Sequence, residues 1–578
     1  MHTFRVWAPT PQKVELAILQ QRIPMAREED GWWSVEMPSL AAASDYGFLL
    51  DEEGPFPDPR SPYQPRGVEG LSRTIAHDNF VWSDTDWQAP PFSSAVIYEL
   101  HIGTFTPRGT FSAAIEKLDH LVELGVTHIE LMPVNEFSGD HGWGYDGVGL
   151  YAPHHAYGSP ESLKRLVEAC HRKGLAVILD VVYNHFGPVG NYWGKFAPYQ
   201  KNNFATPWGP AINFDDAYSD EVRRFFCDNA LMWLRDYHFD GLRLDALHAI
   251  VDNSARPFIE QLAEKVLNLE RLVGRKLVLI AENDLNDPRL LWPRSQGGYA
   301  LHAHWNDDFH HSLHAVLTGE NRGYYADFGT LANLAKALQN AYVYDGRYSP
   351  FRKRRQGRAP TGLDGSHFLA YLQNHDQIGN RALGERSGKL MSMGRMKIAA
   401  ALVFTSPFLP MLFQGEEWGA TTPFLYFSDH RDPKLAAAVR EGRRREFPSF
   451  AGKANEIPDP QAPETFEKSK LNWDELSQPQ HKEFLEWHKK LIRLRRASPR
   501  LASGRMEDVV VRFDEDARWL IVERGDWTIA CNLGTKNLSA PLRKGKHKLV
   551  AVSDAGISLE LPTVSLPPDT VGILKQLG

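Results

Sequence analysis

Hydrophobic and polar residues alternate in three short segments near the N-terminus, at residues 4–8, 14–18 and 46–50. Such alternation places successive side chains on opposite faces of a strand, which is typical of a half-buried sheet. Turns that contain Gly and Pro separate the segments. We therefore expect a small antiparallel β-sandwich over residues 1–88, followed by a Pro-containing linker at 88–92.

From residue 93 the pattern changes to short apolar runs that alternate with segments of helical period. Two of the helical segments, 112–124 and 159–173, begin with Ser, a favoured N-cap residue, and end before Gly. A third helical segment, 219–237, carries one apolar stripe. The apolar runs predict eight strands at residues 95–100, 128–132, 176–182, 241–245, 277–282, 300–305, 368–373 and 410–414.

Eight strands with intervening helices predict an α/β fold, a parallel (β/α)8 TIM barrel over residues 93–498. An open doubly wound sheet fits the same count less well, and the chain has no P-loop. After residue 499 strand alternation returns at 509–513, 519–523 and 528–532. These segments predict a C-terminal antiparallel β domain over residues 499–578.

Composition narrows the possible partners of the chain. Its 578 residues are 42% hydrophobic and 24% charged, which is typical of a globular protein. Acidic residues outnumber basic ones by 72 to 65, so we expect no nucleic-acid or anionic-membrane partner. The aromatic content (16 Trp, 19 Tyr, 30 Phe) is compatible with a carbohydrate ligand, because sugar rings stack on aromatic faces.

The spacing of the cysteines and the length of the apolar runs indicate the cellular compartment in which the protein is expected. Cys170, Cys227 and Cys531 are far apart and form neither a zinc-binding spacing nor a disulfide framework, which fits a reducing compartment. The longest apolar run, 398–413, is interrupted by prolines and is too short to span a bilayer. The first residues lack the apolar core of a signal peptide. We expect a cytoplasmic protein; the sequence carries no signal for its oligomeric state.

Four of the predicted strand ends carry a carboxylate after an apolar run, at Asp180, Asp245, Glu282 and Asp376. In a TIM barrel the functional groups gather at the carboxyl ends of the strands. Arg243 lies two residues before Asp245, so both side chains are expected on the same side of the strand. A guanidinium there would keep the Asp245 carboxylate ionised, which a nucleophile requires.

Glu282 follows an apolar run on the next predicted strand and is expected to hold a proton, as a general acid does. Two carboxylates on adjacent strands are a glycosidase arrangement, and in a retaining mechanism they lie roughly 5 Å apart. A single acid at a strand end also commonly caps the following helix. Asp180 and Asn184 are therefore interpreted as scaffold residues.

Four segments carry a family resemblance, and the resemblance covers roughly residues 95–440. DVVYNH at 180–185, GLRLD at 241–245, AE at 281–282 and NHD at 374–376 resemble, in order and spacing, the four signature regions of the α-amylase family of glycoside hydrolases. The N-terminal segment FRVWAP resembles the front module of branching and debranching enzymes in that family. A C-terminal β domain is also usual there.

The resemblance implies a role for each matching position. Asp245 would be the nucleophile, Glu282 the acid/base and Asp376 the transition-state stabiliser. Four further residues would bind the reacting sugar in subsite −1, with the tyrosine as its stacking platform: Arg243, His185, His375 and Tyr145. No cofactor is implied. The chain has no dedicated Asp-rich loop, so we also expect no essential metal.

A finer resemblance concerns the substrate. Segments 136–149, 151–158 and 281–287 look like those of family members that hydrolyse maltooligosyl trehalose at the α-1,4 bond beside the terminal trehalose unit. Branching enzymes usually have Glu-Glu-Ser and Ser-His-Asp-Glu where this chain has Glu282-Asn-Asp and Asn374-His-Asp-Gln. The resemblance thus implies release of trehalose and a shorter maltooligosaccharide.

Two long loops rich in aromatic and amide residues, 192–216 and 324–365, are our candidates for trehalose recognition, although surface loops of no function can look the same. The basic run 352–355 in the second loop is interpreted as a solvated rim. Two alternatives stay open at this point. One is a branching or debranching enzyme of the same family, and the other is an inactive glucan-binding protein on the same fold.

Overall fold

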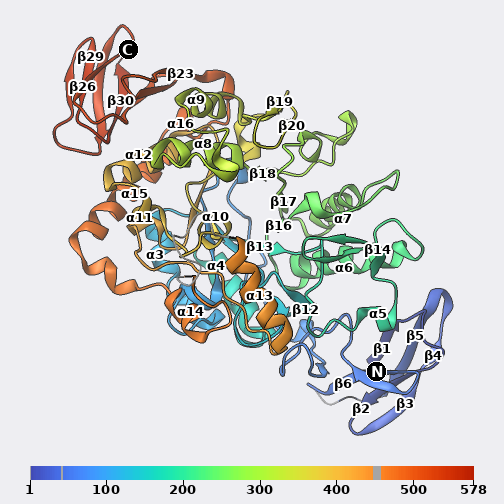
Figure 1. The fold of residues 1–578 in the computed structure, drawn as a ribbon. Coiled ribbons are helices and arrows are strands. Elements are labelled where there is room, and N and C mark those ends of the chain that lie inside the picture. The colour runs from blue at the N-terminus through green and yellow to red at the C-terminus, as the bar shows by residue number, and fades with distance from the viewer. Residues whose placement is uncertain (1, 39, 41–42, 447–456, 578) are drawn as a thin grey trace.

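The computed structural model describes residues 2–38, 40, 43–446 and 457–577. Its centre is a closed parallel barrel in which the first strand pairs with the last (Figure 1). The barrel strands are β9 (Ile97–Leu100), β10 (His128–Leu131), β13 (Ala176–Val181), β16 (Gly241–Leu244), β17 (Val278–Ala281), β18 (Ala303–Trp305), β21 (Phe368–Ala370) and β22 (Leu409–Phe413). The predicted (β/α)8 barrel is confirmed.

Seven of these strands lie within the predicted apolar runs, and β22 begins one residue before its run. The predictions extended too far at the carboxyl ends. Asp245 and Glu282, for example, follow β16 and β17 and do not belong to them. Residues that turn toward a site leave the hydrogen-bonding ladder, so an apolar run followed by a functional acid overstates the length of the strand.

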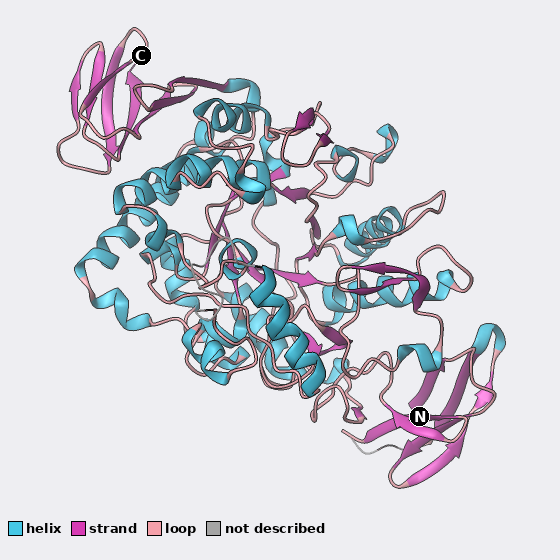
Figure 2. Ribbon diagram, in the orientation of Figure 1, coloured by secondary structure: helices cyan, strands magenta, loops and turns pink. Residues whose placement is uncertain are grey.

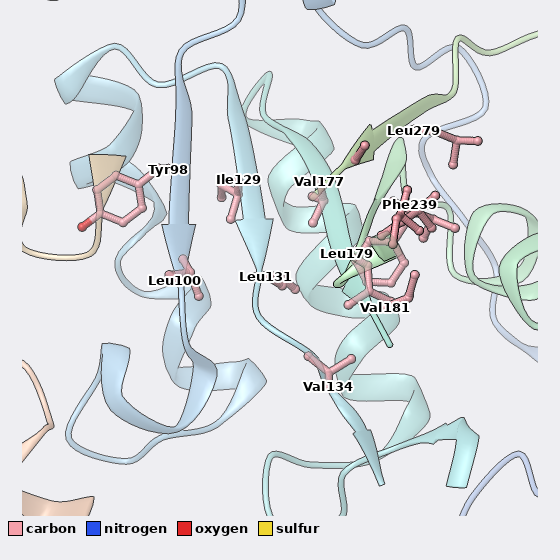
Figure 3. Packing of buried hydrophobic residues seen from close by; sticks show 14 of the residues in the cluster. Tyr98, Leu100, Ile129, Leu131, Val134, Val177, Leu179, Val181, Phe239 and Leu279 are labelled. Atoms are coloured by element: carbon pink, nitrogen blue, oxygen red, sulfur yellow. The ribbon is translucent and has the colours of Figure 1, made fainter. Parts of the chain in front are cut away.

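Alternation along the barrel strands sorts their side chains into two layers. Ile97, Ile178 and Ile280 belong to a small apolar cluster whose buried members, among the described residues, come from barrel strands or lie within two residues of one, so this cluster fills the barrel interior. The intervening residues join the much larger core that the surrounding helices share. Figure 3 shows part of this outer layer, with Ile129 of β10 beside Val177 of β13.

Helices surround the barrel, as Figure 2 shows. Ser159 caps α4 (Pro160–Arg172) as predicted, because its hydroxyl accepts a 3.2 Å hydrogen bond from the Ser162 amide. The predicted helix 112–124 is instead two helices, α2 (Phe111–Ile115) and α3 (Leu118–Leu124). The N-cap of α2 is Thr110, whereas Ser112 was expected. The helix starts earlier because the fully buried Phe111 is part of it, with its ring 5.9 Å from that of Tyr157.

Further helices are α6 (Ser219–Asp236), α8 (Asp307–Thr318), α10 (His375–Gly379), α12 (Met393–Thr405) and α15 (Pro479–Ala497). The first of them confirms the helix that was predicted over residues 219–237. No helix within the described residues is both long enough and apolar enough to cross a membrane.

Antiparallel sheets precede the barrel, as the alternating segments predicted. One sheet has the order β1-β5-β4 and the other β3-β2-β6-β7, with β8 paired to β6. Their bounds are β1 (His2–Trp7), β2 (Val14–Ile18), β3 (Gln21–Pro24), β4 (Ala26–Arg27), β5 (Trp32–Met37), β6 (Asp45–Leu50), β7 (Glu53–Phe56) and β8 (Ser72–Arg73). Phe4, Leu16 and Phe48 are buried in the core that they share with the barrel.

Two further antiparallel sheets close the chain, in the orders β23-β24-β25-β30-β27 and β26-β29-β28. Their bounds are β23 (Val509–Asp514), β24 (Trp519–Arg524), β25 (Trp527–Asn532), β26 (Leu538–Pro541), β27 (Lys546–Val552), β28 (Ser558–Glu560), β29 (Thr563–Leu566) and β30 (Thr570–Leu577). The N-terminal and C-terminal sheets lie at opposite ends of the molecule (Figure 1). The boundaries at residues 88, 93 and 498 stay predictions.

Two buried arginines bind the end of α12, one from the C-terminal sheet and one from α15. Arg524 of β24 donates to the carbonyl oxygens of Thr405 and Ser406 at 2.9 and 2.8 Å, and Arg495 of α15 donates to that of Phe404 at 3.1 Å. The last carbonyl groups of a helix have no partner within the helix. Burial lowers the pKa of Arg495 to about 9 and that of Arg524 to about 10, so both stay charged at neutral pH.

Arg524→Met should lower the free energy of unfolding by about 2–4 kcal/mol, because several buried carbonyl oxygens lose a charged donor. The matched control is Arg512→Met on neighbouring β23, where the arginine is half-buried and pairs with Glu523 at 2.9 Å. That change should cost less than about 1 kcal/mol. Urea unfolding measures the free energy of unfolding of both variants. An equal decrease in the two would show that the contacts of Arg524 with α12 stabilise the fold no more than the surface pair of Arg512 does.

Candidate active site

One buried guanidinium connects three carboxylates from three neighbouring strand ends. Arg243, at the end of β16, donates from Nη1 to Asp180 Oδ2 at 2.7 Å and to Asp245 Oδ1 at 2.9 Å. Its Nη2 lies 3.2 Å from Glu282 Oε2. Strands β13 and β16 run in register with Asp180 opposite Arg243, which explains why the two side chains meet. The Trp305 ring lies 4.2 Å from the guanidinium carbon of Arg243 and covers it.

Asn184 and His185 approach the same cluster from the loop after β13. The amide of Asn184 donates to Asp245 Oδ2 at 2.7 Å and to the Asp245 carbonyl at 3.0 Å. His185 is buried and hydrogen-bonded through Nδ1 to Asn184 Oδ1. Both oxygens of Asp245 therefore accept hydrogen bonds, one from Arg243 and one from Asn184, and these bonds set the orientation of the carboxylate.

Glu282 lies where β17 ends, beside the turn that follows Asp245. Its Oε2 accepts a 2.6 Å hydrogen bond from the Ala246 amide. Ala246 has a positive φ of 41°, an uncommon conformation for a residue with a Cβ, and it turns the chain sharply after Asp245. Burial raises the pKa of Glu282 to about 8; Arg243 opposes this shift and the Asp245 carboxylate adds to it. The side chain of Glu282 keeps 22% of its surface exposed.

Tyr145 lies on the loop between β11 (Asn135–Phe137) and β12 (Gly147–Pro153). Its hydroxyl donates to Asp180 Oδ2 at 2.6 Å and accepts from His375 Nε2 at 2.8 Å. The Tyr145 and His375 rings stack with centroids 5.0 Å apart. The loop needs Gly144, which has φ of 97° and whose Cβ would lie 2.2 Å from a backbone oxygen.

His375 and Asp376 open the short helix α10, and a carboxylate of the first barrel strand holds them. Glu99 of β9 accepts from the His375 amide at 3.0 Å and from its Nδ1. Although burial lowers the pKa of His375, the Glu99 charge raises it above its usual range. Asp376 is further fixed by Asn380, whose amide donates to Oδ1 at 2.5 Å. Burial raises the pKa of Asp376.

The structure brings together all seven residues that the sequence singled out, but the sequence reasoning missed others. Glu99 was one, and Glu130, its register partner on β10, was another. An acid inside an otherwise apolar strand is a usable signal, because burial of a charge needs a reason. Trp305 over Arg243 was also missed, as was Asp307 of α8, which accepts a 2.6 Å bond from Tyr371. Asp307 follows the predicted strand 300–305, so the rule used for the other acids could have found it, whereas nothing local distinguishes Trp305 from a core residue.

The basic run at 352–355 was only partly predicted correctly. Residues 353–355 are exposed, as a solvated rim requires. Arg352 instead turns inward, where its Nη1 lies 3.0 Å from Asp284 Oδ2 and its guanidinium carbon 5.8 Å from the Tyr344 ring. The prediction of a long loop at 324–365 is wrong, because this segment contains α9 (Leu331–Asn340) and the hairpin of β19 (Asp345–Ser349) and β20 (Arg354–Gly357). Arg352, between β19 and β20, ties this hairpin to the segment that follows Glu282, because Asp284 lies two residues further along the chain.

Comparison with known proteins agrees with this geometry. A model of the alpha amylase catalytic domain matches residues 75–207, and a domain of unknown function (DUF3459) matches residues 504–573. A malto-oligosyltrehalose trehalohydrolase of Rhizobium sp. (strain M-11) is 47% identical over 99% of this chain and 97% of its own. One from Mycobacterium tuberculosis is 48% identical over 94% of each chain.

Among solved structures, a protein of Salmonella typhimurium described as an alpha amylase superposes with a TM-score of 0.91. It is 39% identical in sequence, and the match covers 99% of this chain and 97% of that one. Identity at this level over nearly the whole length extends the likeness from the barrel to the sheets at both ends. The chain belongs to the malto-oligosyltrehalose trehalohydrolase family of α-amylase-type glycoside hydrolases.

Proposed function

We propose that this chain is a retaining glycoside hydrolase that cleaves the α-1,4 bond beside the terminal trehalose unit of maltooligosyl trehalose. The products are trehalose and a shorter maltooligosaccharide. The relatives' names supply the substrate. The observation that supports this chemistry is the difference between the two carboxylates beside Arg243. Arg243 donates a hydrogen bond to Asp245, whereas burial raises the pKa of Glu282 to about 8. One carboxylate is then available for attack and the other holds a proton.

The reaction follows from these two protonation states. Asp245 attacks the anomeric carbon of the reacting glucose and forms a covalent glycosyl ester as the bond to trehalose breaks. Glu282 gives its proton to the departing oxygen of trehalose. Water then attacks the same carbon and releases the maltooligosaccharide, while Glu282 takes a proton from that water and Asp245 leaves as a carboxylate. Asp376 stabilises the positive charge that develops on the ring in both steps.

We assign the reacting sugar to the space between Tyr145 and the Asp245 carboxylate. The Tyr145 ring, stacked at 5.0 Å on His375, presents an aromatic face on which the apolar side of a glucose ring can lie. His185, His375 and Arg243 supply hydrogen-bond donors around it. Contacts from Glu99, Asp180 and Asn184 hold these donors in place, so little ordering is required when substrate binds.

The leaving trehalose unit has to bind beyond Glu282, because that residue protonates the departing oxygen. Trp208, in the predicted loop 192–216, has 49% of its surface exposed and lies at the tip of the hairpin β14 (Gln200–Thr206) and β15 (Gly209–Ile212). Its ring lies 5.9 Å from that of His185 and 6.3 Å from that of His248. His248 follows the Ala246 turn that binds Glu282, so Trp208 flanks the acid/base side of the site.

The second predicted loop, 324–365, reaches the same side through Arg352 and its contact with Asp284. Phe351 and Tyr348 on this loop have 46% and 56% of their surfaces exposed. An aromatic face together with a half-buried guanidinium suits a non-reducing disaccharide rich in hydroxyl groups. We therefore assign trehalose recognition to Trp208 on one side and to the loop held by Arg352 on the other.

We also place the reaction in the cytoplasm. The support is that Cys170, Cys227 and Cys531 are free and buried thiols, as expected of a chain that folds in a reducing compartment. Burial raises the pKa of each of these thiols and keeps it in its unreactive protonated form.

Product analysis tests the proposed substrate. Purified protein incubated with maltotriosyl trehalose should release trehalose and maltotriose, and should act only slowly on maltopentaose, which lacks the α,α-1,1 linkage. Arg352→Met should reduce the preference for maltotriosyl trehalose by about tenfold, since the Asp284 contact that orders its loop is lost. Cleavage or chain transfer on maltopentaose at the same rate would instead assign the chain to the general amylase or branching activities.

Asp245→Asn and Glu282→Gln should each lower kcat by about three orders of magnitude or more, because each removes one partner of the double displacement. Asp287→Asn is the matched control: this acid lies in the same loop as Glu282 but caps a short helical turn by accepting from the Arg289 amide at 3.0 Å. It should keep nearly full activity. Single-turnover assays with thermal unfolding measure all three, and a fully active Asp245→Asn would refute the assignment.

The pH dependence follows from the raised pKa of Glu282. The rate should fall as the pH rises through about 8, because the general acid loses its proton. Since this folded-state pKa exceeds the usual 4.5, ionisation of Glu282 destabilises the fold increasingly between these two values. Glu282→Gln should therefore raise the melting temperature relative to wild type more at about pH 8.5 than at about pH 5. Calorimetry at both pH values checks the sign of this difference.

A further inference from the structure

A second cluster of ionisable side chains lies beside the loop that carries Tyr145. Glu136 is on β11, and His154 and His155 directly follow β12, its antiparallel partner. Among the described residues, these three form the group whose possible ligand atoms all lie within 4.8 Å of one another. The cluster is thus assembled at the base of the loop, and no described contact joins it to Asp245 or Glu282.

Two imidazole nitrogens converge on one carboxylate oxygen. His154 Nδ1 lies 3.2 Å and His155 Nδ1 2.9 Å from the same atom, Glu136 Oε1. The side chains of Glu136 and His154 have no exposed surface, whereas 17% of the His155 side chain is exposed. The cluster therefore excludes bulk water on one side and opens to solvent at His155, which gives an ion a path of entry.

The outer atoms of all three side chains are held by the surrounding chain. Glu136 Oε2 accepts from the His155 amide at 2.8 Å. His154 Nε2 lies 3.4 Å from the Asp140 carbonyl oxygen, and His155 Nε2 lies 3.2 Å from Asp140 Oδ1. This is the arrangement found around metal-binding histidines, which donate the proton of the second ring nitrogen to a carbonyl or a carboxylate.

Counting protons shows why a cation fits here. The two rings make four nitrogen-to-oxygen contacts, two with Glu136 and two with Asp140. Two neutral imidazoles carry only two N–H groups. If both Nε2 atoms donate to Asp140, both Nδ1 lone pairs point at Glu136 Oε1, and two lone pairs facing an anionic oxygen repel it. An added cation removes this repulsion, either as a third proton on His155, between Glu136 and Asp140, or as a metal ion between the three atoms.

We propose that Glu136, His154 and His155 bind one divalent transition-metal ion of the Zn²⁺ type through Oε1 and the two Nδ1 atoms. Tetrahedral metal bonds of about 2.0–2.2 Å place ligand atoms on the order of 3.3–3.6 Å apart, so the 2.9 and 3.2 Å separations here have to widen by only a few tenths of an ångström. Two imidazoles with one carboxylate suit Zn²⁺ or Co²⁺, whereas Ca²⁺ and Mg²⁺ require mostly oxygen ligands.

The ion would stabilise the fold and take no part in the reaction. It would fasten the strand before the Tyr145 loop to the segment after it, and Asp140 within that loop is the outer partner of both histidines. His155 also lies between two carboxylates, 2.9 Å from Glu136 and 3.2 Å from Asp140, so a proton on its ring competes with the ion for this site.

The test is metal titration of the full chain after treatment with a chelator. Isothermal titration with ZnCl₂ should show that one Zn²⁺ ion binds tightly per chain. Co²⁺ bound at the same site should give the visible absorption bands of a Co²⁺ ion with few ligands. Zn²⁺ should also raise the melting temperature, because it binds the folded state. His155→Ala should weaken binding by more than about a hundredfold, and Asp140→Asn, an exposed change outside the ligand set, by about tenfold.

His120→Gln is the matched control, since His120 pairs with a single carboxylate, Glu417, at 2.7 Å and has no second histidine beside it. It should bind Zn²⁺ like the wild type. Absence of a saturable equivalent in the wild type would overturn the proposal. So would unchanged binding by both His155→Ala and Asp140→Asn, because the titrated ion would then lie elsewhere on the surface.

Discussion

The buried guanidinium of Arg243 is the interaction on which the site depends. A charged side chain with only 1% of its surface exposed is costly to bury unless its partners compensate, and here Asp180, Asp245 and Glu282 do so. The three acids come from three consecutive barrel strands. Correct pairing of these three strands is therefore a condition for the ion cluster, and the ion cluster in turn holds the strand ends at fixed positions.

A single cation among three acids cannot stabilise all of their charges equally. Arg243 contacts Asp245 at 2.9 Å and Glu282 at 3.2 Å, while burial and the neighbouring acids raise the pKa of Glu282 to about 8. The same packing that excludes water thereby separates the protonation states of two nearby carboxylates. Acid and base chemistry at neutral pH follows from this asymmetry.

Support for the cluster extends outward through residues that do not reach the sugar. Glu99 orients His375, Tyr145 connects His375 to Asp180, and Gly144 allows the Tyr145 loop its close approach to the barrel. The Arg352 contact with Asp284 ties a distant loop to the strand that carries the acid. Loss of any of these contacts should lower the stability of the fold. Its main effect should be to displace the side chains that act on the sugar.

The sequence by itself determined the positions of the barrel strands, the cap at Ser159 and the acids that follow β16 and β17. Periodicity and capping are local properties of the chain, so they can be read without a fold. Only the tertiary structure decided that Glu99 meets His375, 276 residues away, and that Arg352 turns inward to Asp284. The first pairing joins β9 to the segment after β21 past the intervening β22, and the second joins the β19–β20 hairpin, which is outside the barrel, to the segment after β17. Both depend on how the whole chain folds, so no local pattern in the sequence predicts them.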